Sequence, residues 1–180
     1  MNKINQALHD ELLAMRERDQ EVRKTLVEKY GMNPTWSADD LAWMESVDHA
    51  NTTRMKKIIA QYGWPGYSLV GEEGQHTAWL LVQHTNGDLP FQKQCLALLT
   101  AAVAAGDASA RHMAYLVDRV RANEGRPQLY GTQYRIHDGD FFTGEIEDSA
   151  GVEIRRAKVG LGSFEEQLAE LRQLYKPQEE

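Results

Sequence analysis

Two aspartates lie in the middle of otherwise apolar helical patterns. Asp19 fills the gap between Met15 and Val22, where the spacing calls for an apolar residue, and Asp48 does the same in the next helical segment. Burying an unpaired carboxylate is costly, so such positions need charged or hydrogen-bonding partners. We therefore expect a polar interior, which is either an ion-paired network that sets the helix register or a pocket that binds a ligand.

His84 is the best candidate for a general acid or base in such a pocket. Imidazole titrates near neutral pH, and a neighbouring carboxylate can fix its tautomer. Asp48 or Asp19 would be that carboxylate, so these three residues form the predicted catalytic set. A purely structural histidine is the alternative.

Other polar residues are placed where they could bind a substrate. Arg23, four residues after Asp19, and Arg119 supply positive charge for the carboxylates. Hydroxyl and amide groups that follow Pro127 could orient a ligand. The predicted substrate-binding set is Asn51, Gln83, Gln92, Asp118, Arg119, Tyr130, Thr132 and Gln133. The predicted function is binding of a small polar molecule inside a helical bundle, with possible acid/base chemistry.

A metal site is the weaker alternative. Glu73 and His76 form one Glu-x-x-His pair, but a di-iron bundle uses that motif twice. A mononuclear site from His76, His84 and a carboxylate is conceivable. The sequence has no phosphate-binding loop, dinucleotide fingerprint, nucleophile elbow or zinc-ligand spacing. We predict no metal and no cofactor, and any enzyme activity would be that of a hydrolase or lyase using water attack or proton transfer.

Composition and charge exclude several classes of protein. The 180 residues carry a formal charge of -7, which argues against a nucleic-acid partner. No stretch approaches the roughly 20 apolar residues of a membrane span, and residues 1–10 do not resemble a signal peptide. Cys95 is the single cysteine, so an internal disulfide is impossible. We expect a cytoplasmic protein without membrane contact.

The acidity also supports a second hypothesis from another class. An immunity-type or regulatory interaction module would present its negative charge to a basic protein partner. A closed, fully paired polar network would favour this module. An open cavity lined by His84 and Gln133 would count against it.

Helices must position most of these side chains. Capping boxes are predicted at Ser37 with Asp40 and at Ser163 with Glu166, and Asp88 is placed to cap a further helix. The second helix carries an apolar stripe that includes Leu41 and Tyr62. The helices are predicted over residues 2–30, 37–62, 72–84, 88–106, from 107 or 109 to about 125, and 162–175.

A change of pattern after the fifth helix indicates a small β element. Residues 129–142 mix aromatic and β-branched residues with Gly131 and the hairpin-type dipeptide Asp138-Gly139. Residues after Gly144 are predicted to be irregular up to Gly162. The fold class is mainly α: an antiparallel bundle of about six helices with a β hairpin near residues 129–142. We predict a single domain over residues 1–180, with an amino-terminal helical arm (1–18), a β or irregular segment (127–161) and a carboxy-terminal helix (162–175).

Several short motifs carry a resemblance to a known family. They are Gly63-Trp64-Pro65, Val82-Gln83-His84, Phe91-Gln92, the run from Tyr115 to Arg119, Arg155-Arg156 with Gly160-Leu161, and above all the hexapeptide Gln128-Leu129-Tyr130-Gly131-Thr132-Gln133. Together they resemble a bacterial family catalogued as a domain of unknown function, from about Asp19 to Leu161. The resemblance implies no activity that can be carried over, but it includes Asp19, Asp48 and Asn51 and so draws attention to the same polar set.

Overall fold

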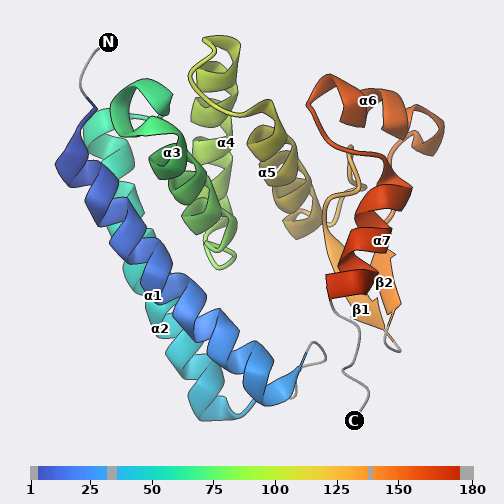
Figure 1. Ribbon diagram of the computed structural model, residues 1–180, viewed down its shortest axis with the longest axis horizontal. Helices are drawn as coiled ribbons and strands as arrows, with labels where there is room; N and C mark the ends of the chain where they lie inside the picture. The colour runs from blue at the N-terminus through green and yellow to red at the C-terminus, as the bar shows by residue number, and fades with distance from the viewer. Residues whose placement is uncertain (1–3, 32–35, 138–139, 175–180) are drawn as a thin grey trace.

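The computed structural model describes residues 4–31, 36–137 and 140–174, which form a mainly helical protein with one small β hairpin (Figure 1). The expected fold class is confirmed. In chain order the elements are α1 (Gln6–Tyr30), α2 (Ala38–Tyr62), α3 (Tyr67–Gln83), α4 (Leu89–Ala104), α5 (Ala110–Asn123), β1 (Tyr134–His137), β2 (Asp140–Thr143), the 3-10 helix η1 (Ser149–Gly151), α6 (Val152–Lys158) and α7 (Phe164–Leu174).

Short polar side chains start four of the helices at the predicted places. Ser37, Asp88, Ser109 and Ser163 each accept a hydrogen bond from the backbone N–H three residues later. Glu166 completes a capping box by accepting from the backbone N–H of Ser163 at 2.8 Å. These bonds satisfy amide groups that have no partner inside the helix, which is why local sequence locates the helix starts so well.

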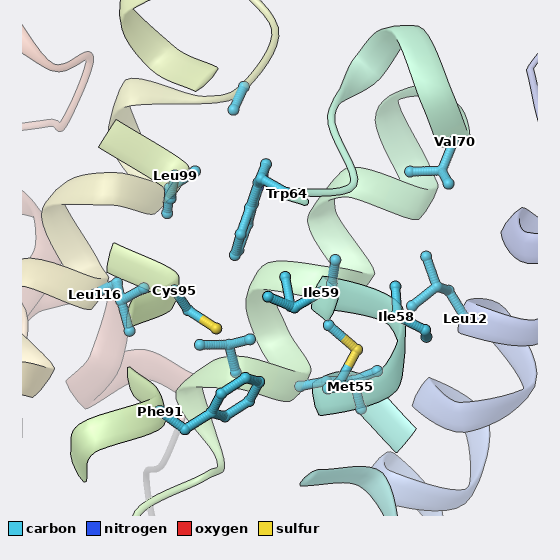
Figure 2. Packing of buried hydrophobic residues seen from close by; sticks show 14 of the residues in the cluster. Leu12, Met55, Ile58, Ile59, Trp64, Val70, Phe91, Cys95, Leu99 and Leu116 are labelled. Atoms are coloured by element: carbon cyan, nitrogen blue, oxygen red, sulfur yellow. The ribbon is translucent and has the colours of Figure 1, made fainter. Parts of the chain in front are cut away.

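The helices pack as antiparallel neighbours around one apolar core. α1 and α2 form a long hairpin on the left of Figure 1, α3 lies against both, and α4 pairs with α5. Figure 2 shows side chains from several helices meeting in this core, including Met55, Ile58, Cys95, Leu99 and Leu116. α6, α7 and the β hairpin lie on the opposite side of the molecule from the α1–α2 hairpin (Figure 1).

The β hairpin forms within the predicted segment. β1 and β2 pair antiparallel, with Tyr134 opposite Thr143 and Ile136 opposite Phe141. The predicted turn at Asp138-Gly139 lies outside the described residues. The first helix is predicted to begin at Asn2, but it begins at Gln6, after Asn5 as its N-cap. α7 packs against β2 and covers the hairpin (Figure 1).

Helix α6 occupies part of the segment that the sequence predicts to be irregular. Its seven residues carry no apolar stripe, and no side chain caps its start. Arg156 holds it from inside the protein, because its buried guanidinium donates to the carbonyl oxygens of Gly162 at 2.8 Å and Tyr130 at 2.7 Å. The helix therefore depends on contacts that are distant in sequence, which periodicity does not register.

Two local predictions need correction. Tyr67–Val70, which lies before the helix predicted from residue 72, is a helical turn that Gly71 separates from the rest of α3 by adopting a positive φ of 72°. Leu41 and Tyr62, expected on the inward stripe of α2, are exposed. An apolar position at the right spacing is therefore not enough to bury a side chain.

Among the helices of the described ranges, none combines the length and the apolarity that a membrane span needs.

Candidate functional site

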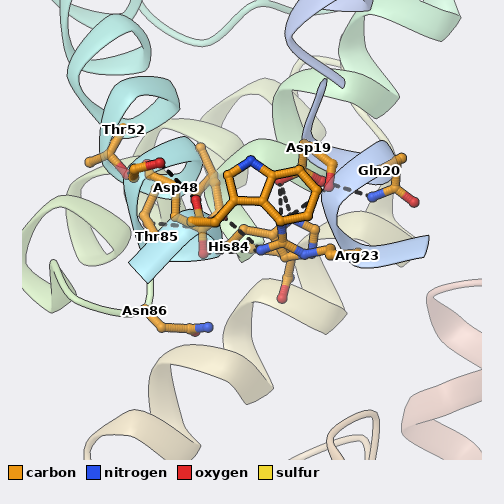
Figure 3. A network of polar contacts seen from close by, with 12 residues as sticks. Asp19, Gln20, Arg23, Asp48, Thr52, His84, Thr85 and Asn86 are labelled. Carbon is orange, nitrogen blue, oxygen red and sulfur yellow. Dashed lines mark hydrogen bonds and ion pairs between the residues drawn. The ribbon is translucent and has the colours of Figure 1, made fainter. Parts of the chain in front are cut away.

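The two unusual aspartates meet at one arginine. Arg23 donates from Nη1 to Oδ1 of Asp19 at 2.8 Å, and from Nη2 to both carboxylate oxygens of Asp48 at 2.8 and 3.1 Å. Figure 3 shows the guanidinium between the two carboxylates, which come from α1 and α2. The predicted pairing of Asp19 with Arg23 is present, and it extends to the neighbouring helix.

His84 joins this network directly after the end of α3. Its Nδ1 lies 2.9 Å from Oδ1 of Asp19. Because an ionised carboxylate only accepts hydrogen bonds, Nδ1 carries the proton. Nε2 bonds to no described residue, and in the neutral ring it is an acceptor. The structure thus selects Asp19 over Asp48 as the carboxylate that orients His84.

The electrostatics keep Asp19 ionised inside the protein. Its side chain has no exposed surface. Burial opposes ionisation, but the hydrogen bond from His84, the charge of His84 and the charge of Arg23 together outweigh it and lower the pKa of the Asp19 carboxyl.

His84 also lines a cavity of about 610 Å³ between α3, α5 and the segment that connects α5 to the β hairpin. Five of the predicted site residues line it: Gln83, His84, Arg119, Thr132 and Gln133. The cavity is also lined by residues outside the predicted set. They include Trp79, Tyr115, Arg126, Gln128, Tyr134, Arg135 and Glu145. The cavity therefore combines aromatic, amide and cationic groups.

Arg119 and Gln83 form a pair on the wall of this cavity. Nε of Arg119 donates to Oε1 of Gln83 at 3.2 Å, and Nη1 lies 3.4 Å from Oδ1 of Asn86. Both acceptors are neutral amides, and no carboxylate of the described chain pairs with Arg119. Burial, and secondarily the charge of Arg23, lowers the pKa of Arg119.

Asp118, the residue before Arg119, points away from this pair. Its fully buried carboxylate accepts from the backbone N–H groups of Leu129, Tyr130 and Thr132 and from the Thr132 hydroxyl, at 2.7 to 3.2 Å. It anchors the segment that carries the hexapeptide. Asp118 and Tyr130, both predicted to bind substrate, do not line the cavity.

A reciprocal pair of hydrogen bonds shapes the same segment. Gln128 donates from Nε2 to the carbonyl oxygen of Gln133 and accepts from the backbone N–H of Gln133 at its Oε1. Nε2 of Gln133 lies 3.3 Å from the carbonyl oxygen of Tyr115. The hexapeptide is thus folded onto α5 as a wall of the cavity.

Residues 6–178 match the Family of unknown function (DUF6624). The chain belongs to this family. No curated protein and no solved structure matches it. The expected membership in a family of unknown function is confirmed, and the DUF6624 match over residues 6–178 extends beyond the expected span of about Asp19 to Leu161.

Three more predicted residues of this DUF6624 chain lie outside the cavity. Gln92 is buried under α3, where it donates to the carbonyl oxygen of Val82 at 3.2 Å and accepts from Asn123 at 2.8 Å. Asn51 is buried on α2, and its Nδ2 has no partner among the described residues. Asp48 bonds to Arg23 and is also absent from the cavity wall. Some residues of the predicted set therefore line the cavity, and the others lie outside it.

The residues of the alternative metal site have other partners. Glu73 accepts from Arg16 at 2.8 Å, Nδ1 of His76 lies 3.1 Å from Nε2 of His112, and His84 bonds to Asp19. Across residues 4–31, 36–137 and 140–174, no group of three or more His, Cys, Asp or Glu side chains is placed to hold a metal ion.

Some cavity residues could have been found from the sequence, and others could not. Tyr115 and Gln128 belong to the motifs that carry the family resemblance, although neither was selected as a site residue. Trp79 lies in an apolar stretch of α3, and such a stretch predicts a buried core residue. Arg126 and Arg135 lie in a turn and a strand whose position relative to α3 depends on the tertiary fold.

Proposed function

We propose that this protein binds a small polar molecule in the cavity between α3, α5 and the 125–135 segment. One observation carries the proposal: His84 and Gln133, which are 49 positions apart, line the same cavity. A sealed, fully paired network would have favoured the protein-interaction module. The cavity instead supports a ligand site.

Within this proposal, His84 is the acid/base residue. The Asp19 carboxylate holds the proton on Nδ1, so Nε2 can accept a proton from a water molecule or from the ligand. The imidazolium that forms would be stabilised by Asp19, in the manner that carboxylate–histidine pairs use in hydrolases. This chemistry fits a hydrolase- or lyase-like reaction that needs no covalent intermediate.

Asp48 and Arg23 are positioning residues in this scheme. Arg23 bridges the two carboxylates and so fixes Asp19, which in turn orients the ring. Gln83, Arg119, Thr132 and Gln133 are the ligand-binding groups.

The experiment is a thermal-shift screen of the full chain against a library of small polar metabolites. Hits are then measured by calorimetry with His84→Ala and with His49→Ala, in which an exposed histidine on α2 is removed. We expect His84→Ala to lose binding or turnover and to keep the wild-type circular dichroism spectrum. Binding that survives equally in both variants would remove His84 from the site.

The same proposal places the protein in the bacterial cytoplasm, with no membrane or nucleic-acid partner. Its support is the acidic composition, the single buried cysteine and the family resemblance.

A further inference from the structure

The cavity differs in charge from the rest of the chain. Overall the formal charge is -7. Among the described lining residues, however, Arg119, Arg126 and Arg135 carry positive charge, whereas Glu145 is the one carboxylate. Positive charge collected on the wall of a cavity attracts anions from solution.

Arg119 is half-buried, whereas Arg126 and Arg135 are exposed. Arg126 pairs with Glu124 at 3.0 Å, and Arg121, only two residues after Arg119 on α5, pairs with Glu147. Arg119 instead contacts two amide oxygens at 3.2 and 3.4 Å. A guanidinium has five donors in a planar fork that suits a carboxylate or phosphate, so most of its capacity is unused here.

Gln83 adds a second donor at the same place. Since a guanidinium only donates, the Gln83 amide must turn its oxygen toward Arg119, which leaves Nε2 as a donor. This Nε2 is buried and has no partner in the described residues. Trp79 Nε1, on another lining residue, is also buried and without a partner. A buried donor without an acceptor is costly, so these groups favour a ligand that supplies acceptors.

We propose that the ligand is a small organic anion whose carboxylate or phosphate group binds to Arg119 and Gln83. The inference rests on the proposed function, since it assumes that the cavity holds the ligand. A bound anion would also offset the repulsion between Arg119 and Arg23. Because His84 follows Gln83 in the chain and lines the same cavity, the anionic group serves as a handle beside the acid/base residue. Trp79 and Tyr115 line the part of the cavity that can take the uncharged portion of the ligand.

Ring compounds that are similar in shape but differ in charge test whether the ligand is an anion. Benzoate and phenyl phosphate each carry a ring and an anionic group, and benzamide is the uncharged match for benzoate. Each is titrated into the full chain while the side-chain N–H signals of Trp79 and Gln83 are followed by NMR. We expect saturable shifts with the two anions, binding of benzamide at least tenfold weaker, and weaker anion binding at high salt.

Variants on one helix then locate the anion. Arg119→Gln should weaken anion binding at least tenfold, and Arg119→Lys should weaken it less because the charge remains while the fork is lost. Arg111→Gln removes an exposed arginine from the same helix and should leave the dissociation constant unchanged. If Arg119→Gln unfolds the protein, two other results decide whether the anion binds to Arg119. Weaker anion binding in Arg119→Lys and at high salt supports the site, and unchanged binding in both excludes it.

Failure of this inference is distinguishable from failure of the proposed function. If benzamide binds as tightly as benzoate, or if Arg119→Gln leaves anion binding unchanged, the anionic ligand is excluded. In that case loss of binding of neutral library hits in His84→Ala would still support the ligand site. If no probe and no library compound shifts a cavity signal, both proposals are overturned.

Discussion

Thr132 donates both its backbone N–H and its hydroxyl to the same oxygen of Asp118, at 2.9 and 3.0 Å. The other oxygen accepts from the backbone of Leu129 at 2.7 Å. A carboxylate from α5 therefore organises a segment that would otherwise leave several buried N–H groups without acceptors. Because this segment forms a wall of the cavity, Asp118 acts on the site through structure.

Asp118→Asn should lower the free energy of unfolding by about 2–4 kcal/mol, because the amide nitrogen cannot accept the bonds that the carboxylate accepts. Urea denaturation measures the loss, and hydrogen exchange at the Thr132 N–H should become faster. As a control, Asp39→Asn alters an exposed aspartate in the first turn of α2, with an expected change of at most about 1 kcal/mol. Equal effects of the two substitutions would contradict the anchoring role.

The two aspartates that share Arg23 should differ in their contribution to stability. Asp19 has no exposed side-chain surface, whereas Asp48 is 19% exposed. Asp19→Ala removes a buried partner of both Arg23 and His84 and should cost about 3–5 kcal/mol. Asp48→Ala leaves Arg23 paired with Asp19 and should cost about 1 kcal/mol. Chemical denaturation checks the order, and a larger loss from Asp48→Ala would refute this description of the network.

His112 should make the protein less stable at mildly acidic pH. Its Nδ1 lies 3.0 Å from Oε1 of Gln75, and its Nε2 lies 3.1 Å from Nδ1 of His76. A neutral His112 can donate to Gln75 and accept from His76. Burial, followed by the charges of His76 and Arg111, lowers the pKa of His112 from 6.5 to about 4.

The lowered pKa means that the unfolded chain takes up this proton more readily than the folded protein. The contribution of His112 to stability is therefore complete above pH 6.5 and is lost as the pH falls from 6.5 to about 4. The loss is at most about 3 kcal/mol. The His112 ring is stacked on Trp79, and a phenylalanine ring can keep this contact. Denaturation midpoints measured across this range should fall less steeply in His112→Phe than in wild type. His49→Phe, at an exposed position, should keep the wild-type slope.

Gly131 should tolerate no side chain. Its φ is +64°, and an added Cβ would lie 2.7 Å from Cε2 of Phe164 and 2.8 Å from Cδ1 of Ile146. Gly131→Ala should cost about 2–4 kcal/mol through backbone strain and overpacking. Gly87→Ala, where a Cβ meets nothing within 4 Å, should change stability by no more than about 1 kcal/mol. A similar, small effect in both variants would show that the hexapeptide and α7 are not tightly packed.

Local sequence determined most of the helices of this protein. Caps at Ser37, Asp88 and Ser163, and apolar residues spaced three and four apart, act within one or two turns of chain, so their effect can be read without the fold. The same spacing identified Asp19 and Asp48 as polar residues within apolar stripes. It also placed Arg23 one helical turn from Asp19. The β hairpin was readable for a similar reason, because its two strands are adjacent in the chain.

Tertiary structure decided what these residues contact. Three contacts depend on which helix faces meet. His84 bonds to Asp19 and not to Asp48, Asp118 accepts from the segment after α5, and Arg119 meets no carboxylate among the described residues. Such pairs are separated by up to 65 positions in the case of Asp19 and His84, and no local pattern encodes the rotation of one helix against another. The sequence by itself therefore determined the elements and the polar residues between them, whereas helix packing decided which of these residues share a cavity.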